Sequence, residues 1–421
     1  MVVVGAGDAV LSKLRSEIVR NNAYMKALLV GSLFALPAGL MLIYELSWPN
    51  ADLLQPNRFY LGTDFINYWS GGRLALGGRV DIIYDVPAYA KLLKSWFLPE
   101  LRPVNFSYPP HSLLFFMAPG ALPYLSGLVL WSFYGAVAFG AVALGRRPQH
   151  GDAPIVWAII LAPVLWCNVV LGQLGLFLAL LFVGALRALP TRPILAGVLI
   201  GMLTVKPQFG LLLPLVLILL GAWRTFAAAT VTTLLLIGAS MALFGVEPWQ
   251  VYISKTMPFQ WQFIELMEGF YRFQMVTPYT VFWFLGFPVK TALALQAMVS
   301  VAVALAVIVV VRSKAAWPLK AASVALGSVL MVPYVLAYDL AIPFAALVWY
   351  LREQDTPVTS FGVGLTGLAW ALPFGVGTLV QTQGVPLLPV VLIVCFCWLT
   401  ARALSWRWNF ARRRVATAQL A

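Results

Sequence analysis

The stretch whose side chains are best suited to take part in a reaction is Leu61–Arg73, which reads LGTDFINYWSGGR. Asp64 follows the first long apolar run, and a carboxylate close to such a run is costly unless it has a role. At neutral pH a carboxylate is ionised and can accept a proton from a hydroxyl group that attacks an electrophilic carbon. The structural alternative is a helix cap, because aspartate is favoured at helix N-termini and Asp64 directly precedes Phe65. Asp64 is therefore a candidate functional residue or a cap.

Further polar residues stand in short connections between apolar runs. These are Tyr108 and His111 in FSYPPH, Gln173 after Gly172, Lys206 and Gln208 in KPQ, and the pair Tyr338 and Asp339. A lysine can stabilise an anion, and amide or hydroxyl groups can orient a polar substrate. Each residue is equally compatible with an ordinary turn, a helix end or interfacial packing. A shared site requires that the elements between them bring these connections to one place.

Composition indicates what those elements are. Of the 421 residues, 61% are apolar and only 10% are charged, whereas about 25% are charged in a typical soluble domain. A spanning helix needs about 17–25 apolar residues. The sequence therefore predicts an all-α polytopic membrane protein with about 10–13 transmembrane helices. The candidate spans are about 27–46, 124–144, 154–171, 174–188, 193–206, 208–222, 225–244, 291–311, 320–337, 340–351, 359–379 and 385–402; 111–122 is too short to span alone.

Positive charge gathers on alternate connections. Lys13, Arg15 and Lys26 precede the first apolar run, and Arg412 and Arg413 follow the last one. The positive-inside rule then places both termini in the cytoplasm of a plasma (inner) membrane protein, with the candidate residues outside. We expect a cytoplasmic basic leader at 1–26, a single transmembrane domain at 27–402 with extracytoplasmic loops at 47–110 and 245–290, and a cytoplasmic basic tail at 403–421. The net charge of +13 then reflects topology and contact with membrane lipid, and needs no nucleic acid.

Several classes of site find no support in the motifs. The sequence has no HExxH, no Cys/His cluster, no Asp-x-Asp, no P-loop and no GxGxxG, so we expect neither a metal site nor a cofactor. A secondary transporter would account for the many helices and for their Gly/Pro interruptions, but the two halves show no convincing repeat. A non-catalytic scaffold would give Asp64 no special role. The transporter remains the main alternative to an enzyme at this point.

Five short motifs, in order, resemble one enzyme family. They are TDF-x-x-Y-W-x-G-G-R around Asp64, GG-x-x-D-I-I-Y-D at Gly77–Asp85, F-x-YPP at Phe106–Pro110, then GQ, then KPQ. Together they resemble the polytopic glycosyltransferases of the GT-C class, and within it glycosyltransferase family 87, over roughly residues 25 to 350. Characterised relatives are polyprenol-phosphate-mannose-dependent α-mannosyltransferases. The resemblance implies a GT-C-like fold whose long first extracytoplasmic loop contains short helices.

The resemblance also implies an activity. We expect a hexosyltransferase that moves a hexose, mannose by resemblance, from a polyprenyl-phosphate sugar to a lipid or glycan acceptor on the extracytoplasmic face. Asp64 occupies the position of the general base, and a single base implies inversion at the anomeric carbon. Candidates for binding the donor phosphate are Lys206, Arg73 and Arg272. Candidates for lining the substrate pocket are Tyr68, Trp69, Tyr108, His111, Gln173, Gln208, Tyr338 and Asp339.

Overall fold

The computed structural model describes residues 23–37, 39–40, 60–101, 104–146, 148, 152–266, 274–353, 359–374 and 384–418. Over these residues the secondary structure is helical apart from one isolated bridge, between Met275 and Leu336. Five helical segments are long and apolar enough to cross a membrane: α5 (Tyr124–Leu144), α6 with α7 (Ala153–Leu171), α11 (Trp223–Phe244), α16 (Val289–Arg312) and the first part of α21 (Leu387–Ser405). The predicted class, an all-α polytopic membrane protein, is confirmed.

Six further apolar helices are shorter than a full span. They are Ala23–Pro37, Gly175–Ala188, Pro193–Val205, Pro207–Leu219, Trp317–Leu330 and Ser360–Ala371. Three of them are α8 (Gly175–Ala188), α17 (Trp317–Leu330) and α19 (Ser360–Ala371). The segment Pro193–Val205 consists of α9 (Pro193–Met202) and the 3₁₀ turn η3 (Leu203–Val205). The segment Pro207–Leu219 consists of the 3₁₀ turn η4 (Pro207–Gly210) and α10 (Leu213–Leu219). The buried α18 (Ala341–Glu353) packs against α17, α8 and α5. Helices α17 and α18 belong to the core, since nearly all of their residues are buried, whereas the first helix, α9 and α19 also expose large apolar side chains such as Phe34, Ile194 and Phe361.

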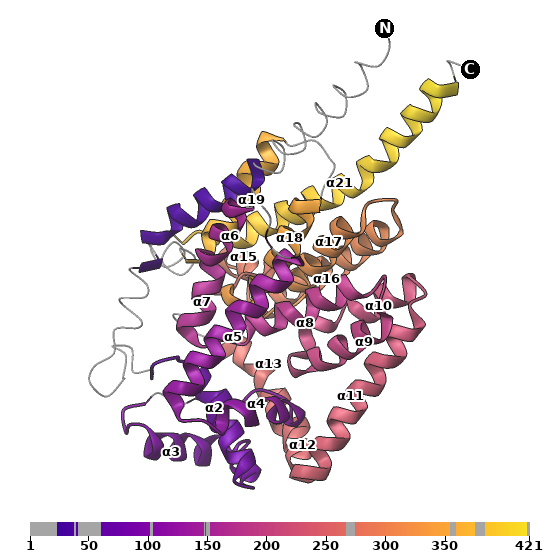
Figure 1. Ribbon diagram of the computed structural model, residues 1–421. Coiled ribbons are helices and arrows are strands. Elements are labelled where there is room, and N and C mark those ends of the chain that lie inside the picture. The colour runs from indigo at the N-terminus through magenta and orange to yellow at the C-terminus, as the bar shows by residue number, and fades with distance from the viewer. Residues whose placement is uncertain are drawn as a thin grey trace.

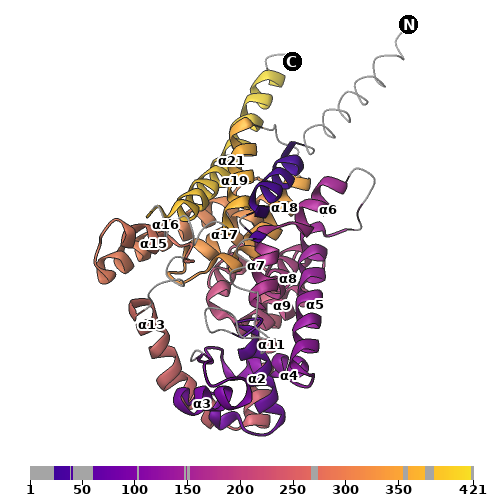
Figure 2. The ribbon, with the colours of Figure 1, turned by 90° about the vertical axis from the view of Figure 1, so that its left-hand side faces the viewer.

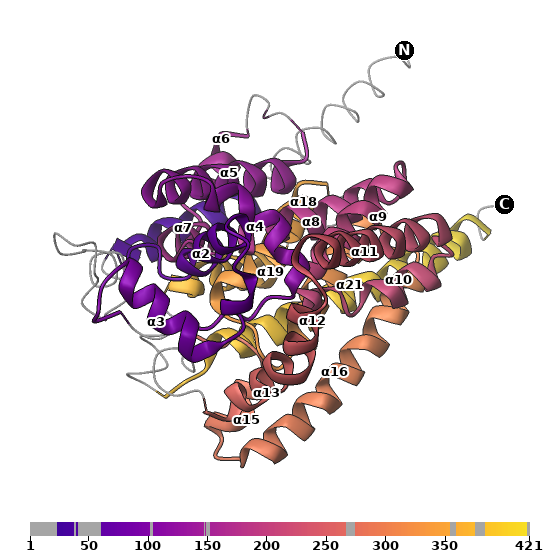
Figure 3. The same cartoon turned by 90° about the horizontal axis from the view of Figure 1, so that it is seen from below.

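The short helices predicted for the first long loop are present in its described part. α2 (Phe65–Leu76), η1 (Val80–Ile82) and α3 (Val86–Trp96) lie at one end of the molecule, and the C-terminal part of α21 lies at the other (Figure 1). Figure 2 and Figure 3 show α2, α3 and α4 (Leu113–Gly120) gathered at this same end, with α12 (Glu247–Val251) nearby. The second long segment continues as the π-helical turn η5 (Tyr252–Thr256), α13 (Met257–Leu266) and, after a gap, α15 (Pro278–Phe284).

Two glycines bring α2 and α4 into backbone contact. A Cβ at Gly72 would lie 1.8 Å from the carbonyl oxygen of Phe116, and a Cβ at Gly120 would lie 2.4 Å from the backbone nitrogen of Arg73. Only glycine permits so close an approach. The apolar segment 111–122 is therefore a separate helix packed on α2, and it is joined to α5 through a turn at 121–123.

The opposite end of α5 is capped by arginine side chains from two other helices. Arg187 of α8 donates to the carbonyl oxygens of Val142 (2.9 Å) and Ala143 (3.1 Å). Arg352 of α18 donates to the carbonyl oxygen of Leu144 and to Asp152 (2.8 Å). The last carbonyls of a helix have no partner within the helix. The arginines satisfy them and tie together α5, α8 and α18 at this end.

We predict that Arg187→Met destabilises the protein, because two buried carbonyl groups lose their donor and Arg187 also stacks over Trp349 at 4.3 Å. The expected loss is roughly 2–4 kcal/mol in free energy of unfolding, seen as a lower melting temperature in detergent. Arg146→Gln is the matched control, since the Arg146 side chain is half-exposed and such ion pairs contribute less than about 1 kcal/mol. Equal melting temperatures for the two variants would contradict this account of the cap.

Candidate active site

Asp64 lies in a tight turn immediately before α2. The Tyr124 hydroxyl donates to the carbonyl oxygen of Leu61 at 2.6 Å, and the Asp64 backbone N–H donates to the carbonyl oxygen of Leu171 at 3.0 Å. The turn requires positive φ angles at Gly62 (81°) and Thr63 (32°). A threonine in this region is strained, and such strain is common beside functional residues. Asp64 occupies the N-cap position of α2, but its side chain makes no capping hydrogen bond, so the helix-cap alternative does not explain it.

Gln173 is the residue that holds the Asp64 carboxylate. Helix α7 (Pro163–Leu171) ends in a Schellman turn, in which Gly172 has φ +62° and the Gln173 N–H donates to the carbonyl oxygen of Asn168 at 2.8 Å. This turn directs the Gln173 side chain toward α2, where Nε2 donates to Asp64 Oδ2. The other Asp64 oxygen, Oδ1, has no hydrogen-bond partner among the residues that the structure describes. The half-buried carboxylate is thus fixed by one oxygen and open at the other.

Two tyrosines extend this hydrogen-bonded chain. The Tyr68 hydroxyl donates to Gln173 Oε1 at 3.0 Å, and the Tyr108 hydroxyl lies 2.8 Å from that of Tyr68. Because Tyr68 donates to Gln173, the remaining proton between the tyrosines belongs to Tyr108. Every donor in the chain therefore points toward Asp64. Aligned donors polarise one another and favour the ionised carboxylate.

Lys206 and Asp339 form a buried ion pair beside this chain. Lys206 Nζ lies 2.6 Å from Asp339 Oδ1, and the two residues are 8% and 1% exposed. The ammonium also lies 5.2 Å from the ring centroids of Phe209 and Tyr338. Asp339 Oδ2 accepts the Leu336 backbone N–H at 3.2 Å. Lys206 stands at the bend between η3 and η4, where Pro207 interrupts the helical run.

The segment that carries Asp339 is held by backbone pairing to a distant loop. Val276 N–H donates to the carbonyl oxygen of Val335 at 3.0 Å, and Ala337 N–H donates to that of Gln274 at 3.1 Å. Asn168 Nδ2 donates to the carbonyl oxygen of Tyr338 at 2.8 Å. Asn168 thus joins the Asp339 segment to helix α7, whose C-terminal turn positions Gln173.

These groups shift the pKa of Asp64. Burial raises it from 3.8 to about 6; the Gln173 hydrogen bond and the Lys206 charge lower it, whereas the Asp339 charge raises it. Asp64, Lys206 and Asp339 therefore act on one another within one electrostatic cluster. A carboxylate with a pKa near 6 is mostly ionised at neutral pH and is a stronger base than an exposed one.

The remaining sequence candidates are placed differently. His111 is buried, stacks on Trp249 with a ring separation of 5.6 Å, and its Nε2 lies 3.1 Å from Thr204 Oγ1. Gln208 is partly exposed on η4, next to the Lys206 bend. Both adjoin the cluster in sequence, and the His111 ring contacts Trp249 and Thr204, outside the Asp64 and Lys206 cluster.

Arg73 and Trp69 lie on another side of α2. Arg73 is nine residues from Asp64, which on an α-helix is about 180° around the axis and about 13 Å along it. Its guanidinium lies over Trp69, at 5.3 Å, and faces the carbonyl oxygen of Gly120. Trp69 donates to the carbonyl oxygen of Leu122 at 2.9 Å. The structure thus separates Arg73 from Asp64, and Arg272 lies outside the described residues.

One part of the cluster was not found from the sequence. Trp131 of α5 donates from Nε1 to the carbonyl oxygen of Gln173 at 3.3 Å, and its ring packs against Tyr68 and Phe65. A tryptophan within an apolar run carries no sequence signal that separates such a contact from lipid-facing packing.

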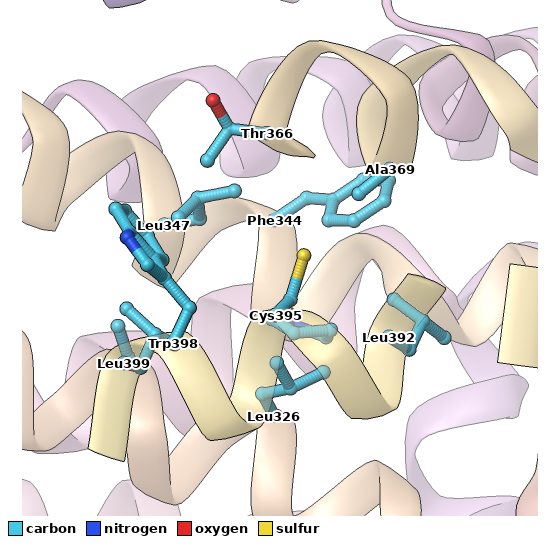
Figure 4. A pocket seen from close by; sticks show the side chains of 11 residues that line it. Leu326, Phe344, Leu347, Thr366, Ala369, Leu392, Cys395, Trp398 and Leu399 are labelled. Atoms are coloured by element: carbon cyan, nitrogen blue, oxygen red, sulfur yellow. The ribbon is translucent and has the colours of Figure 1, made fainter. Parts of the chain in front are cut away.

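A small cavity of about 20 Å³ lies elsewhere, between α17, α18, α19 and α21 (Figure 4). Its walls are mostly apolar side chains such as Phe344, Leu347 and Trp398. They also include the thiol of Cys395 and the hydroxyl of Thr366, which donates to backbone carbonyl oxygens. A space of this size is a packing gap between helices.

The fold and the cluster define a multi-pass membrane protein with a candidate base at one end. A family model described as glycosyltransferase family 87 matches residues 106–333, more than half of the chain. The chain belongs to this family and is a membrane glycosyltransferase, which decides against the transporter alternative. No curated protein and no solved structure matches the chain. The matched range contains Tyr108, Gln173 and Lys206, whereas Asp64 and Asp339 lie outside it.

We predict that Asp64→Asn makes the folded protein more stable at neutral pH. The carboxyl ionises near 3.8 when exposed and near 6 when folded, so the folded state of the native chain loses stability as pH rises through this interval. Asparagine carries no such cost and still accepts the Gln173 hydrogen bond. The melting temperature of the variant in detergent should exceed that of the native chain above pH 6, and the difference should shrink toward pH 3.8. A difference that does not change with pH would refute the raised pKa.

Proposed function

We propose that this glycosyltransferase moves a hexose, with mannose as the first candidate, from a polyprenyl-phosphate sugar to a lipid or glycan acceptor on the extracytoplasmic face. Asp64 is the general base, and the observation that carries this role is its geometry. One oxygen is fixed by Gln173 and the other is free of partners among the described residues. A fixed carboxylate with one available oxygen and a raised pKa suits removal of a hydroxyl proton.

The reaction then proceeds by direct displacement. The acceptor oxygen gives its proton to Asp64 and forms a bond to the anomeric carbon, while the bond from that carbon to the phosphate oxygen breaks. One displacement by one nucleophile inverts the anomeric centre. Negative charge grows on the departing phosphate. Lys206, the one phosphate-binding candidate that lies in the Asp64 cluster among the described residues, stabilises this charge.

The length of α5 supports the proposed sidedness. Tyr124, at its start, bonds to the Asp64 turn, and Leu144, at its end, bonds to Arg352. The 21 residues of α5 span about 31 Å, close to the thickness of the hydrocarbon core. Arg146, Arg187 and Arg352 therefore lie about one membrane thickness from Asp64. The positive-inside rule places that arginine end in the cytoplasm and Asp64 outside.

The assay that tests this function is transfer of labelled sugar in liposomes. Purified protein receives radiolabelled polyprenyl-phosphate sugars together with an extract of host lipids and glycans. We predict that Asp64→Asn lowers turnover by about 10²–10⁴-fold, the usual contribution of a general base, without loss of folded protein. Asp85→Asn is the matched control: it changes the same charge in the same loop, at a helix N-cap where asparagine also serves. Full turnover by Asp64→Asn would exclude the base assignment.

A second prediction concerns the pH profile of that transfer. Gln173→Leu removes the donor that stabilises ionised Asp64, so the pKa of Asp64 should rise further. The acid limb of kcat/KM should move upward by roughly one pH unit. Tyr68→Phe removes only the next donor in the chain and should shift the limb in the same direction by less. An unchanged limb in both variants would show that the chain does not tune the base.

A further inference from the structure

The candidate site holds fewer positive charges than its proposed substrate needs. Among the described residues, the cluster contains two carboxyl groups, Asp64 and Asp339, and one ammonium, Lys206. The Lys206 charge is already matched by Asp339, at 2.6 Å. The other titratable side chains that interact with Asp339 are Tyr68, Tyr108 and Tyr338. Burial raises the pKa of each tyrosine, so they are neutral at neutral pH.

A polyprenyl-phosphate sugar is a phosphodiester and brings one more negative charge. If both carboxyl groups stayed ionised, three negative charges would share one ammonium in a site largely closed to water. Uncompensated charge in such surroundings is costly, and an ionisable group responds by becoming neutral. Either the donor binds weakly or one carboxyl group takes up a proton.

Burial and hydrogen bonding decide which carboxyl group does so. Asp64 is half-buried, and its hydrogen bond from Gln173 does not involve Lys206, so this bond is kept when the sugar-phosphate substrate binds. Asp339 is 1% exposed, and among the described residues its side chain accepts hydrogen bonds only from Lys206 and from the Leu336 N–H, the latter on Oδ2. Once the phosphate shares the Lys206 charge, the negative charge of Asp339 is less well stabilised than that of Asp64. Protonated on Oδ1, it keeps the Leu336 hydrogen bond and gains a proton to donate to a phosphate oxygen.

We infer that donor binding is coupled to the uptake of one proton by Asp339. Asp339 is then a positioning residue, because its protonation frees the Lys206 ammonium to pair with the donor phosphate. The inference rests on the proposed function, because it assumes that Lys206 binds the phosphate. It adds a consequence that the base role of Asp64 does not require: the affinity for the donor falls as pH rises. The proton comes from solvent, and no covalent bond changes in this step.

The test measures binding of farnesyl methyl phosphate, a diester that stays singly charged across the neutral range and has no sugar to transfer. Full-length Asp64→Asn protein in detergent is the parent, because it removes the other titrating carboxyl group. We expect its Kd to rise with pH, by up to about tenfold per pH unit. Titration calorimetry in buffers of different ionisation enthalpy should count close to one proton taken up per ligand bound.

Asp339→Asn in the same parent mimics the protonated carboxyl group. We expect its Kd to be independent of pH and, at high pH, lower than that of the parent, with no proton uptake. A residue with only a structural role would not produce tighter binding on substitution. Asp85→Asn in the same parent should keep the pH slope, and farnesol, which has no charge, should show no slope with any variant.

The outcomes separate this inference from the function on which it rests. A parent whose Kd is constant with pH and that takes up no proton overturns the inference, even if wild-type protein transfers sugar and requires Asp64. If Asp339→Asn does not fold, the proton count of the parent alone decides. If the diester does not bind at any pH, Lys206 does not hold the donor phosphate and the inference falls. Absence of transfer from every polyprenyl-phosphate sugar overturns the proposed function itself.

Discussion

The close approach between the α7–α8 turn and the Asp64 turn is the constraint on which the rest of the site depends. A Cβ on Gly172 would lie 2.5 Å from Cβ of Phe65 and 2.7 Å from the carbonyl oxygen of Gly62. Only glycine fits there, and its φ of +62° also ends α7. One residue therefore terminates a membrane helix and lets the loop that carries the candidate base come within hydrogen-bond range.

Gln173 converts that approach into a defined geometry. Its backbone N–H and carbonyl oxygen bond to Asn168 and Trp131, and its side-chain amide bonds to Tyr68 and Asp64. Since each polar group of Gln173 has a partner, the side chain has little freedom to leave the carboxylate. Burial raises the pKa of Asp64, and the hydrogen bond from Gln173, 109 positions away in sequence, lowers it again in part. A base tuned in this way can stay ionised without being fully exposed.

The sequence was a good guide to the class of fold, because run lengths and charge asymmetry indicated a polytopic helical protein. Asp64 was chosen because a carboxylate beside an apolar run is costly, and Gln173 and Lys206 because they are polar residues in short turns. Their roles stay predictions, and the structure brings the three residues into one electrostatic cluster. Helix boundaries were less certain, since an apolar run does not show where backbone pairing begins. The predicted span 320–337 ends at Leu330, because residues beyond it pair with 274–276. The predicted span 154–171 is two helices, separated before Pro163.

The sequence could not predict which distant residues pair, but it could have excluded Arg73 from the Asp64 cluster. Lys206 and Asp339 are 133 positions apart, and nothing in either turn indicates that one neutralises the other. By contrast, the helical period alone puts Arg73 on the opposite side of α2 from Asp64. Arg73 was a candidate because a guanidinium group suits a phosphate. That choice did not take the helical period into account, and the structure places Arg73 away from Asp64.

The arrangement of charges also links the two halves of the proposed reaction. Lys206 lowers the pKa of Asp64 in the unliganded site. Proton uptake by Asp339 keeps the balance of charge when the donor arrives, because the phosphate brings one negative charge to Lys206 while Asp339 loses one. The pKa of Asp64 then stays close to its value in the unliganded site, and Asp64 remains ionised when an electrophile is present for the acceptor to attack. A single ammonium shared between Asp339 and the phosphate can thus admit the donor without protonating the base and without any movement of helices.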